Sequence, residues 1–249
     1  MEHEAVFLEG VNFSYASWPV LEEVSLFVGR GEYVCILGPN GGGKTTLLKI
    51  ILGLATPNSG KVSLLGQRPE QARVKAGYMP QAIQSDTQVP VTLKEVVLMG
   101  RLGGGGGWRY SRSDLKRAEE VLAFLGLDAM KDRFFGELSG GQKQRAMFAR
   151  ALACDPEVLL LDEPTANVDP EGGKILAELL AELKGKVALL LVTHDLSFVS
   201  EHVDRVFCIN RRVVEHPTSE LDASSLHDLY NEPIRLVRHD LVLGKKDRS

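Results

Sequence analysis

Apolar and polar positions alternate in short runs through the first third of the chain. Residues 5–13 and 20–27 show the two-residue period of half-buried strands, with turn residues from Ser14 to Pro19 between them, so we expect an antiparallel pair. The run at residues 33–37 is apolar throughout, which is typical of a strand buried on both faces. Two shorter strands are expected at residues 61–65 and 76–79.

Helical spacing dominates from about residue 90 to residue 153. Helices are expected at residues 92–99, from an N-cap at Ser113 onward, and at residues 138–153. The apolar side of the helix after Ser113 consists of Leu115, Ala118, Val121, Leu122 and Leu125. The consecutive glycines at 103–107 predict a flexible loop, with ordering on a docked partner as the alternative.

Strands and helices alternate again in the last third of the chain. Apolar strands are expected at residues 158–161, 187–192 and 205–209. Asp169-Pro170 places an N-cap aspartate before an N1 proline, which predicts a helix start, and another helix is expected to end near His202. Beyond about His216 the chain is polar and mixed, with a short helix expected at residues 224–230.

Composition limits the class of protein. The chain has 249 residues, enough for one large α/β domain or two small ones, and its net charge of −4 gives no general attraction to nucleic acid. Cys35, Cys154 and Cys208 lie in apolar runs, so we expect buried, reduced thiols. The amino terminus lacks the apolar segment of a signal peptide, and no apolar run is long enough to span a bilayer. We therefore expect a cytosolic protein.

A glycine-rich segment joins the strand at 33–37 to a helix expected at residues 46–52. It reads Gly38-Pro39-Asn40-Gly41-Gly42-Gly43-Lys44-Thr45-Thr46 and matches the G-x-x-x-x-G-K-[ST] pattern of phosphate-binding loops. The N–H groups of such a loop surround phosphates at the positive end of a helix. We expect Lys44 to reach the β- and γ-phosphates and the Thr45 hydroxyl to hold Mg²⁺.

Two carboxylates follow the strand at 158–161. Asp162 lies at the carboxyl edge of the expected parallel sheet, where ligands bind in such folds, and we expect it to hold Mg²⁺ through water. Glu163 is suited to act as a general base for an attacking water. His194 ends the next apolar strand and could hydrogen-bond the γ-phosphate, although a histidine at a strand end is more often structural.

The segment at 138–142 reads Leu-Ser-Gly-Gly-Gln. Ser139 is a good N-cap, and Gln142 stands three residues later, at the spacing of a capping box. Capping does not explain Gly140 and Gly141, because a glycine inside a helix costs roughly 1 kcal/mol relative to alanine. Two glycines would let a ligand approach the first N–H groups of the helix, so the segment predicts a second anion site.

These motifs together resemble the ATP-binding cassette (ABC) ATPase family. The segments at 38–46, 138–142 and 158–164, followed by His194, have the order and spacing of that family, and the resemblance covers about residues 5–215. It implies an α/β P-loop NTPase fold with a RecA-like core sheet, an antiparallel β subdomain and a helical subdomain. The ATPase domain would span residues 1–215, with the helical subdomain inserted at about 90–153 and a carboxyl-terminal tail at 216–249.

The resemblance implies ATP and Mg²⁺ as cofactors and assigns roles to single residues. Tyr15 matches the aromatic that stacks on adenine, and Gln81 matches the glutamine that senses Mg²⁺ and couples to a partner. Glu163 matches the catalytic base, His194 the switch histidine, and Asp169 the loop that communicates across a dimer.

The resemblance also implies partners. Ser139, Gly140 and Gln142, with Gly141 between them, match the signature that contacts the γ-phosphate bound to the other subunit, so two copies would form a head-to-tail homodimer around two ATP. Family members of this kind work with integral membrane permease subunits, which dock on the region at 90–137, and with a substrate-binding protein. This places the chain at the cytoplasmic face of the cell membrane, with no nucleic acid partner.

Only the resemblance of short segments to particular family members indicates the transported cargo. Residues 96–101 resemble a segment of metal-ion and metal-chelate importers, and residues 206–212 and 229–239 resemble zinc and manganese uptake ATPases. Importers of iron chelates or another small solute remain alternatives, as does a cassette of an exporter. A soluble cassette ATPase acting on DNA or ribosomes is the alternative of another class, but the chain has neither a coiled-coil insertion nor a second cassette. His216, His227 and His239 could bind a regulatory metal, or belong to a solvated tail.

Overall fold

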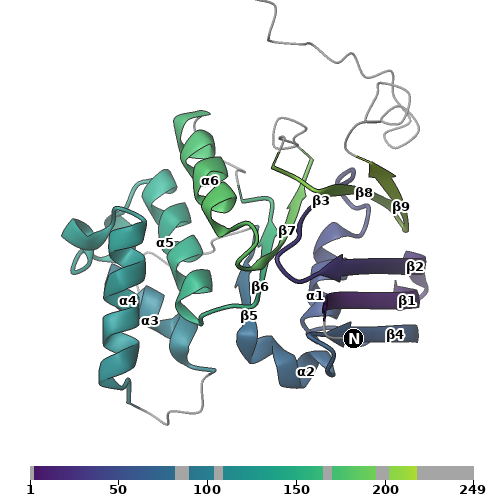
Figure 1. The fold of residues 1–249 in the computed structure, drawn as a ribbon, viewed down its shortest axis with the longest axis horizontal. Helices are drawn as coiled ribbons and strands as arrows, with labels where there is room; N and C mark the ends of the chain where they lie inside the picture. The colour runs from purple at the N-terminus through teal and green to yellow at the C-terminus, as the bar shows by residue number, and fades with distance from the viewer. Residues whose placement is uncertain (1–2, 82–89, 104–108, 165–169, 195–201, 218–249) are drawn as a thin grey trace, which may run out of the picture.

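The computed structural model describes residues 3–81, 90–103, 109–164, 170–194 and 202–217. Figure 1 shows three strands at one end of the molecule, a group of helices at the other, and the strands of a larger sheet between them. No helix in the described ranges is long and apolar enough to cross a membrane.

The larger sheet has six strands in the order β5-β6-β7-β3-β8-β9. Their bounds are β3 (Tyr33–Leu37), β5 (Ala76–Met79), β6 (Val158–Asp162), β7 (Ala188–Thr193), β8 (Arg205–Asn210) and β9 (Arg212–Pro217). The first five in spatial order are parallel, and β9 returns antiparallel to β8. The carboxyl ends of β3, β6 and β7 therefore meet at one edge of the sheet.

The parallel strands are apolar throughout because each of their faces packs against a different core. On β3, Val34 and Ile36 face a core shared with helix α1 (Lys44–Ile51), whereas Cys35 and Leu37 face a core shared with the helices on the opposite side. The same alternation holds on β6 and β7. The strands predicted at residues 33–37, 76–79, 158–161, 187–192 and 205–209 are thus confirmed, within a residue at each end.

The smaller sheet is antiparallel, in the order β2-β1-β4, and covers α1 from the side away from the larger sheet. It consists of β1 (Glu4–Tyr15), β2 (Trp18–Gly29) and β4 (Ser59–Leu64), which confirms the predicted antiparallel pair. The pair is longer than predicted, because only Ala16 and Ser17 form the turn and Tyr15 ends a strand. A short helix α2 (Pro69–Ala72) and a 3-10 turn η1 (Arg73–Lys75) lead from β4 to β5.

The region between residues 90 and 153 is helical, as predicted. It contains α3 (Leu93–Leu98), α4 (Arg112–Phe124) and α5 (Gly140–Ala153), together with the 3-10 turns η2 (Met99–Arg101), η3 (Asp128–Met130) and η4 (Phe135–Glu137). The predicted N-cap of α4 is wrong: Ser111, not Ser113, caps this helix. Ser111 Oγ accepts a hydrogen bond from Asp114 N, and the Asp114 carboxylate accepts one from Ser111 N, so the capping box begins two residues earlier.

Helix α6 (Pro170–Leu183) begins at the predicted proline. Its predicted N-cap, Asp169, lies outside the described residues, as do residues 195–201, most of the loop at 103–107 and the helix predicted at 224–230. Strand β9 is not predicted by the sequence analysis, and it runs two residues past the expected domain boundary at 215. Cys35 and Cys208 are buried free thiols as predicted, whereas Cys154 is only half-buried.

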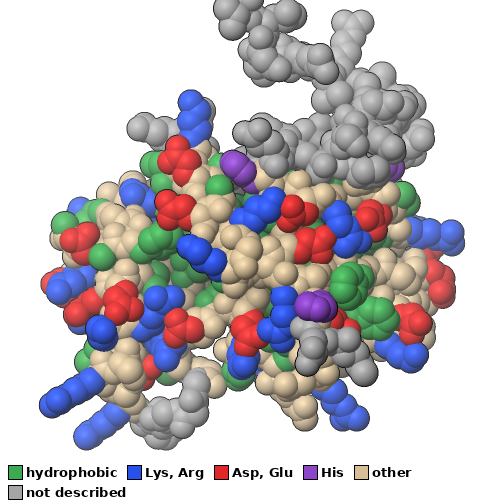
Figure 2. Space-filling view, in the orientation of Figure 1, with side chains coloured by type: hydrophobic (Ala, Val, Ile, Leu, Met, Phe, Trp, Pro, Cys, Tyr) green, Lys and Arg blue, Asp and Glu red, His purple; other side chains and the backbone are tan. Residues whose placement is uncertain are grey.

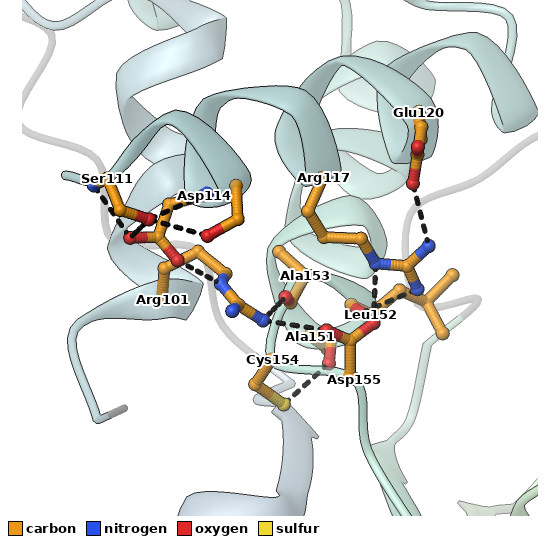
Figure 3. A network of polar contacts seen from close by, with 11 residues as sticks. Arg101, Ser111, Asp114, Arg117, Glu120, Ala151, Leu152, Ala153, Cys154 and Asp155 are labelled. Carbon is orange, nitrogen blue, oxygen red and sulfur yellow. Dashed lines mark hydrogen bonds and ion pairs between the residues drawn. The ribbon is translucent and has the colours of Figure 1, made fainter. Parts of the chain in front are cut away.

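Two arginines fasten the end of α5 to the other helices of this region (Figure 3). Arg101 donates to Asp114 Oδ1, to Ala153 O and to Asp155 Oδ2, each at 2.8 Å. Arg117 on α4 pairs with Asp155 Oδ1 at 2.6 Å. Because the last carbonyl groups of a helix have no partners within it, these arginines cap α5 while they join three segments.

Close backbone packing accompanies this polar network. A Cβ atom on Gly100 would lie 2.1 Å from Arg150 O and 3.1 Å from Ala153 Cβ, so only glycine allows η2 to approach α5 this closely.

We expect Gly100→Ala to lower the melting temperature by several degrees, because overpacking costs about 1–3 kcal/mol and would separate η2 from α5. Gly103→Ala is the matched control, since its Cβ would make an ordinary contact of 3.6 Å with Val74. Thermal unfolding followed by circular dichroism measures both. Equal melting temperatures for the two variants would contradict a tight contact at Gly100.

Candidate nucleotide-binding site

The segment between β3 and α1 forms a tight loop, and its conformation requires glycine at two positions. A Cβ on Gly38 would lie 2.2 Å from Ile209 O, at the end of β8. Gly43 has a φ of 99°, and a Cβ there would lie 2.7 Å from Leu21 Cδ2. The loop is also bonded to the turn between β8 and β9, since Arg211 N donates to Gly42 O at 3.2 Å.

Helix α1 begins without a side-chain cap. Its N-cap residue is Gly43, no side chain caps its N–H groups, and its first turn contains no acidic residue. The first N–H groups of a helix have no partners within it, and they carry a partial positive charge. This end of α1 is therefore suited to bind an anionic group such as a phosphate.

Lys44 lies just inside this loop and is only 6% exposed. Its ammonium group donates to Gly38 O at 2.8 Å and to Pro39 O at 3.0 Å, and it pairs with Glu163 Oε1 at 3.1 Å. The lysine is thus a buried positive charge at the start of α1, in contact with loop carbonyl groups and with Glu163.

Glu163, directly after β6, accepts contacts from three other segments. Its carboxylate pairs with Lys44, accepts a hydrogen bond from Gln81 Nε2 at 2.8 Å, and lies 3.2 Å from His194 Nδ1. Glu163 is 6% exposed and has a φ of 48°, a conformation that costs a non-glycine residue free energy. The structure therefore brings Lys44, Gln81, Glu163 and His194 together at the carboxyl edge of the sheet.

Asp162 is the most deeply buried charged group of the site, with 1% of its surface exposed. No hydrogen bond of ordinary geometry reaches either carboxylate oxygen from the described residues, although the hydroxyls of Thr45 and Tyr78 lie near it. Burial raises the pKa of Asp162, which Thr45 partly opposes. A buried carboxylate without a partner, beside a threonine hydroxyl, has the oxygen donors that Mg²⁺ prefers, so these residues fit that ion.

A cavity of about 370 Å³ opens above the loop. Its lining residues come from the loop, the start of α1, the β1–β2 hairpin and the edge of the sheet where the parallel strands end: Tyr15, Val20, Asn40, Gly41, Gly43, Lys44, Thr45, Thr46, Gln81 and Glu163. Tyr15 is half exposed at the cavity, and Phe13 packs edge-on against its ring, with 4.8 Å between the ring centroids. Sequence reasoning does not single out Val20 or Tyr78, because both look like ordinary strand residues.

The Leu138–Gln142 segment lies at the start of α5, as predicted. Ser139 is the N-cap, and its hydroxyl accepts from Gln142 N while Gln142 Oε1 accepts from Ser139 N at 2.9 Å. A Cβ on Gly141 would meet nothing within 4 Å, so the packing of this chain does not require glycine there. The segment lines a separate cavity of about 520 Å³ between α5 and α6, and none of its residues lines the cavity above Lys44.

The fold and the site together define a class of protein: an α/β ATPase cassette with a glycine loop, paired strand-end carboxylates and a capped glycine signature. Comparisons with known proteins agree. The ABC transporter family model matches residues 21–166. A "Probable metal transport system ATP-binding protein" of Chlamydia muridarum is 41% identical over 84% of this chain and 89% of its own length.

Two further relatives have named cargoes. The chain is 40% identical to a zinc transport system ATP-binding protein of Treponema pallidum, over 84% of this chain and 80% of that protein. It is 38% identical to a manganese transport system ATP-binding protein of Bacillus subtilis, over 87% of this chain and 88% of that protein.

Solved structures give the same assignment. The fold matches an inward-facing ABC transporter assigned to the metal-chelate type with a TM-score of 0.82, at 28% identity, over 94% of this chain and 90% of that one. A bacterial cassette solved as a dimer matches with a TM-score of 0.73, at 28% identity, over 86% and 98%. The chain belongs to the ABC transporter family, as an ATPase of that family that hydrolyses ATP for transport.

Proposed function

We propose that this chain powers a membrane importer of divalent metal ions, zinc or manganese. The identity of about 40% with ATPases of zinc and manganese systems, over most of both chains, is the observation that supports this cargo. The match to a structure of the metal-chelate type supports a chelate importer as the second candidate.

The phosphates of ATP would lie on the loop at 38–46, against the uncapped start of α1. Lys44 would contact the β- and γ-phosphates, the other loop residues would supply N–H groups, and Tyr15 would stack on the adenine. Thr45 and Asp162 would hold Mg²⁺, with Gln81 beside them. The ion, when bound, neutralises phosphate charge.

The ion pair between Lys44 and Glu163 suggests how nucleotide binding prepares hydrolysis. Phosphates that draw the Lys44 ammonium group toward them would take it from Glu163, which leaves that carboxylate free to accept a proton from water. Gln81 and His194 would keep Glu163 in place, because both contact its other oxygen, Oε2. Lys44, Glu163 and His194 are therefore the proposed catalytic residues.

A second copy of the chain would complete the site. Ser139, Gly140, Gly141 and Gln142 are remote from the cavity above Lys44 within one chain, so they could act on the nucleotide of a partner. The open space at Gly141 and the dimeric state of a similar cassette support this head-to-tail homodimer. Asp169 would take part in the contact between the two copies.

The remaining partners follow from the transporter system. Permease subunits in the membrane would dock on the helical region at 90–137, and a substrate-binding protein would deliver the cargo, so the chain would act at the cytoplasmic face of the membrane. On the face drawn in Figure 2, basic and acidic side chains are intermixed, and nothing there favours nucleic acid as a partner. The proposed domain organisation is an ATPase domain at 1–215 followed by a tail at 216–249.

We expect Glu163→Gln to bind ATP but to hydrolyse it at least 10²-fold more slowly, the lower end of what general bases contribute. Phosphate release at saturating ATP measures turnover, and equilibrium dialysis measures ATP binding. Glu178→Gln, an exposed glutamate on α6, is the control. Turnover equal to that of the control would remove Glu163 from the mechanism.

We expect Ser139→Arg to abolish ATP-dependent dimerisation, because the larger charged side chain would occupy the space that a partner's nucleotide needs. Sedimentation velocity with ATP, in the hydrolysis-deficient Glu163→Gln background, measures the dimer. Ser113→Arg places the same side chain on exposed α4 as a control. A dimer of normal stability with Ser139→Arg would argue against the head-to-tail arrangement.

Co-purification with the native permease, followed by reconstitution in vesicles, tests the cargo. With the substrate-binding protein added, we expect zinc or manganese to stimulate ATP hydrolysis and to enter the vesicles. Stimulation by a ferric chelate alone would select the second candidate. Hydrolysis unaffected by any of the three would contradict both.

A further inference from the structure

The hairpin between β1 and β2 carries a second aromatic side chain beside Tyr15. Trp18 pairs directly with Tyr15 across the two-residue turn of Ala16 and Ser17, in which Ala16 has a φ of 52°. Residues paired in an antiparallel ladder point to the same face of the sheet, with Cβ atoms about 4.5–5.5 Å apart. Trp18 therefore projects from the same face as Tyr15.

This face of the hairpin looks toward the phosphate loop. Tyr15 and Val20 both line the cavity above Lys44, and Leu21 lies against Gly43. The pairing of β1 with β2 shifts by one residue near the turn, because Phe13 pairs with Leu21 while Ser14 pairs with Pro19. Val20 is therefore an extra, unpaired residue in β2. Such a bulge allows Val20 and Leu21 to face the same side.

The Trp18 side chain packs little against the rest of the fold. It is 76% exposed, more than any other large apolar side chain in the described ranges, whereas Phe13 on the same face is 8% exposed and supports the Tyr15 ring. An indole left in water beside a ligand cavity gains favourable contact area when a planar apolar group covers it.

We propose that Trp18 contacts the purine base of the bound nucleotide and, with Tyr15, forms an aromatic wall around it. The inference rests on the proposed function, because it needs the phosphates on the loop at 38–46 and the base at Tyr15. Aromatic side chains bind bases through their π-faces, and a second one increases the area that the base covers. Trp18 is thus a binding residue that raises the affinity for a base-bearing ligand and leaves the phosphate contacts unchanged.

Fluorescence of the full chain carrying Trp108→Phe tests the contact, since Trp18 is then the only tryptophan. We expect ATP and ADP to change the Trp18 emission in a saturable way. Inorganic tripolyphosphate, which can occupy the phosphate loop but has no base, should leave the emission unchanged. An emission unaffected by ATP under conditions where dialysis detects binding, or an equal change with tripolyphosphate, would overturn the inference.

Binding measurements provide the second test. Trp18→Ala should weaken ATP binding by at least about fivefold, while tripolyphosphate affinity stays within about twofold of the unsubstituted chain. Trp18→Phe should retain most of the affinity. Phe27→Ala removes another exposed aromatic at the far end of β2 and should change neither constant.

An ATP affinity of Trp18→Ala within twofold of the Phe27→Ala control would overturn the contact with the base while leaving the phosphate site intact. An unsubstituted chain that bound neither ATP nor tripolyphosphate would overturn the proposed nucleotide site, and the role of Trp18 with it.

Discussion

The central constraint on this structure is that its parallel strands are buried on both faces. β3, β6 and β7 carry apolar side chains on each side, because α1 and the smaller sheet cover one face and α5 and α6 the other. Polar side chains are therefore confined to the strand ends. The three strands are neighbours and run parallel, so the groups that follow them meet at a single edge. The same burial that stabilises the domain thus concentrates its reactive groups.

The charges at that edge are tolerated because they satisfy one another. Lys44 and Glu163 are each 6% exposed, and an isolated buried charge of either sign would be strongly destabilising. Their ion pair, together with the two carbonyl groups that accept hydrogen bonds from Lys44, offsets part of that penalty. Asp162 is more deeply buried than either, and no hydrogen bond of ordinary geometry reaches its carboxylate from the described residues. A cation held beside Asp162 would balance this buried charge.

Local signals explain what sequence could predict. The strand, glycine loop and helix from Tyr33 to Ile51 are contiguous, and each part is specified by its own residues. The order of the strands is not local, so the contacts of Glu163 with Gln81 and His194 could not be derived from spacing alone. The N-cap of α4 was within reach of the sequence: Asp114 stands three residues after Ser111, and that spacing selects Ser111 over Ser113. Strand β9 alternates too weakly to be recognised, and its pairing with β8 specifies it.

The loop at 38–46 packs against a segment that is distant in the sequence, the turn between β8 and β9. Ile209 fills the space where a Cβ of Gly38 would lie. Arg211 N donates a hydrogen bond to Gly42 O, and Arg211 O accepts one from Glu22 N. The turn between β8 and β9 is therefore hydrogen-bonded to the loop on one side and to β2 on the other. Strand β9 continues from this turn to Pro217. The loop and this turn are therefore coupled, so a force applied to the end of β9 would reach the loop at 38–46 through Ile209 and Arg211.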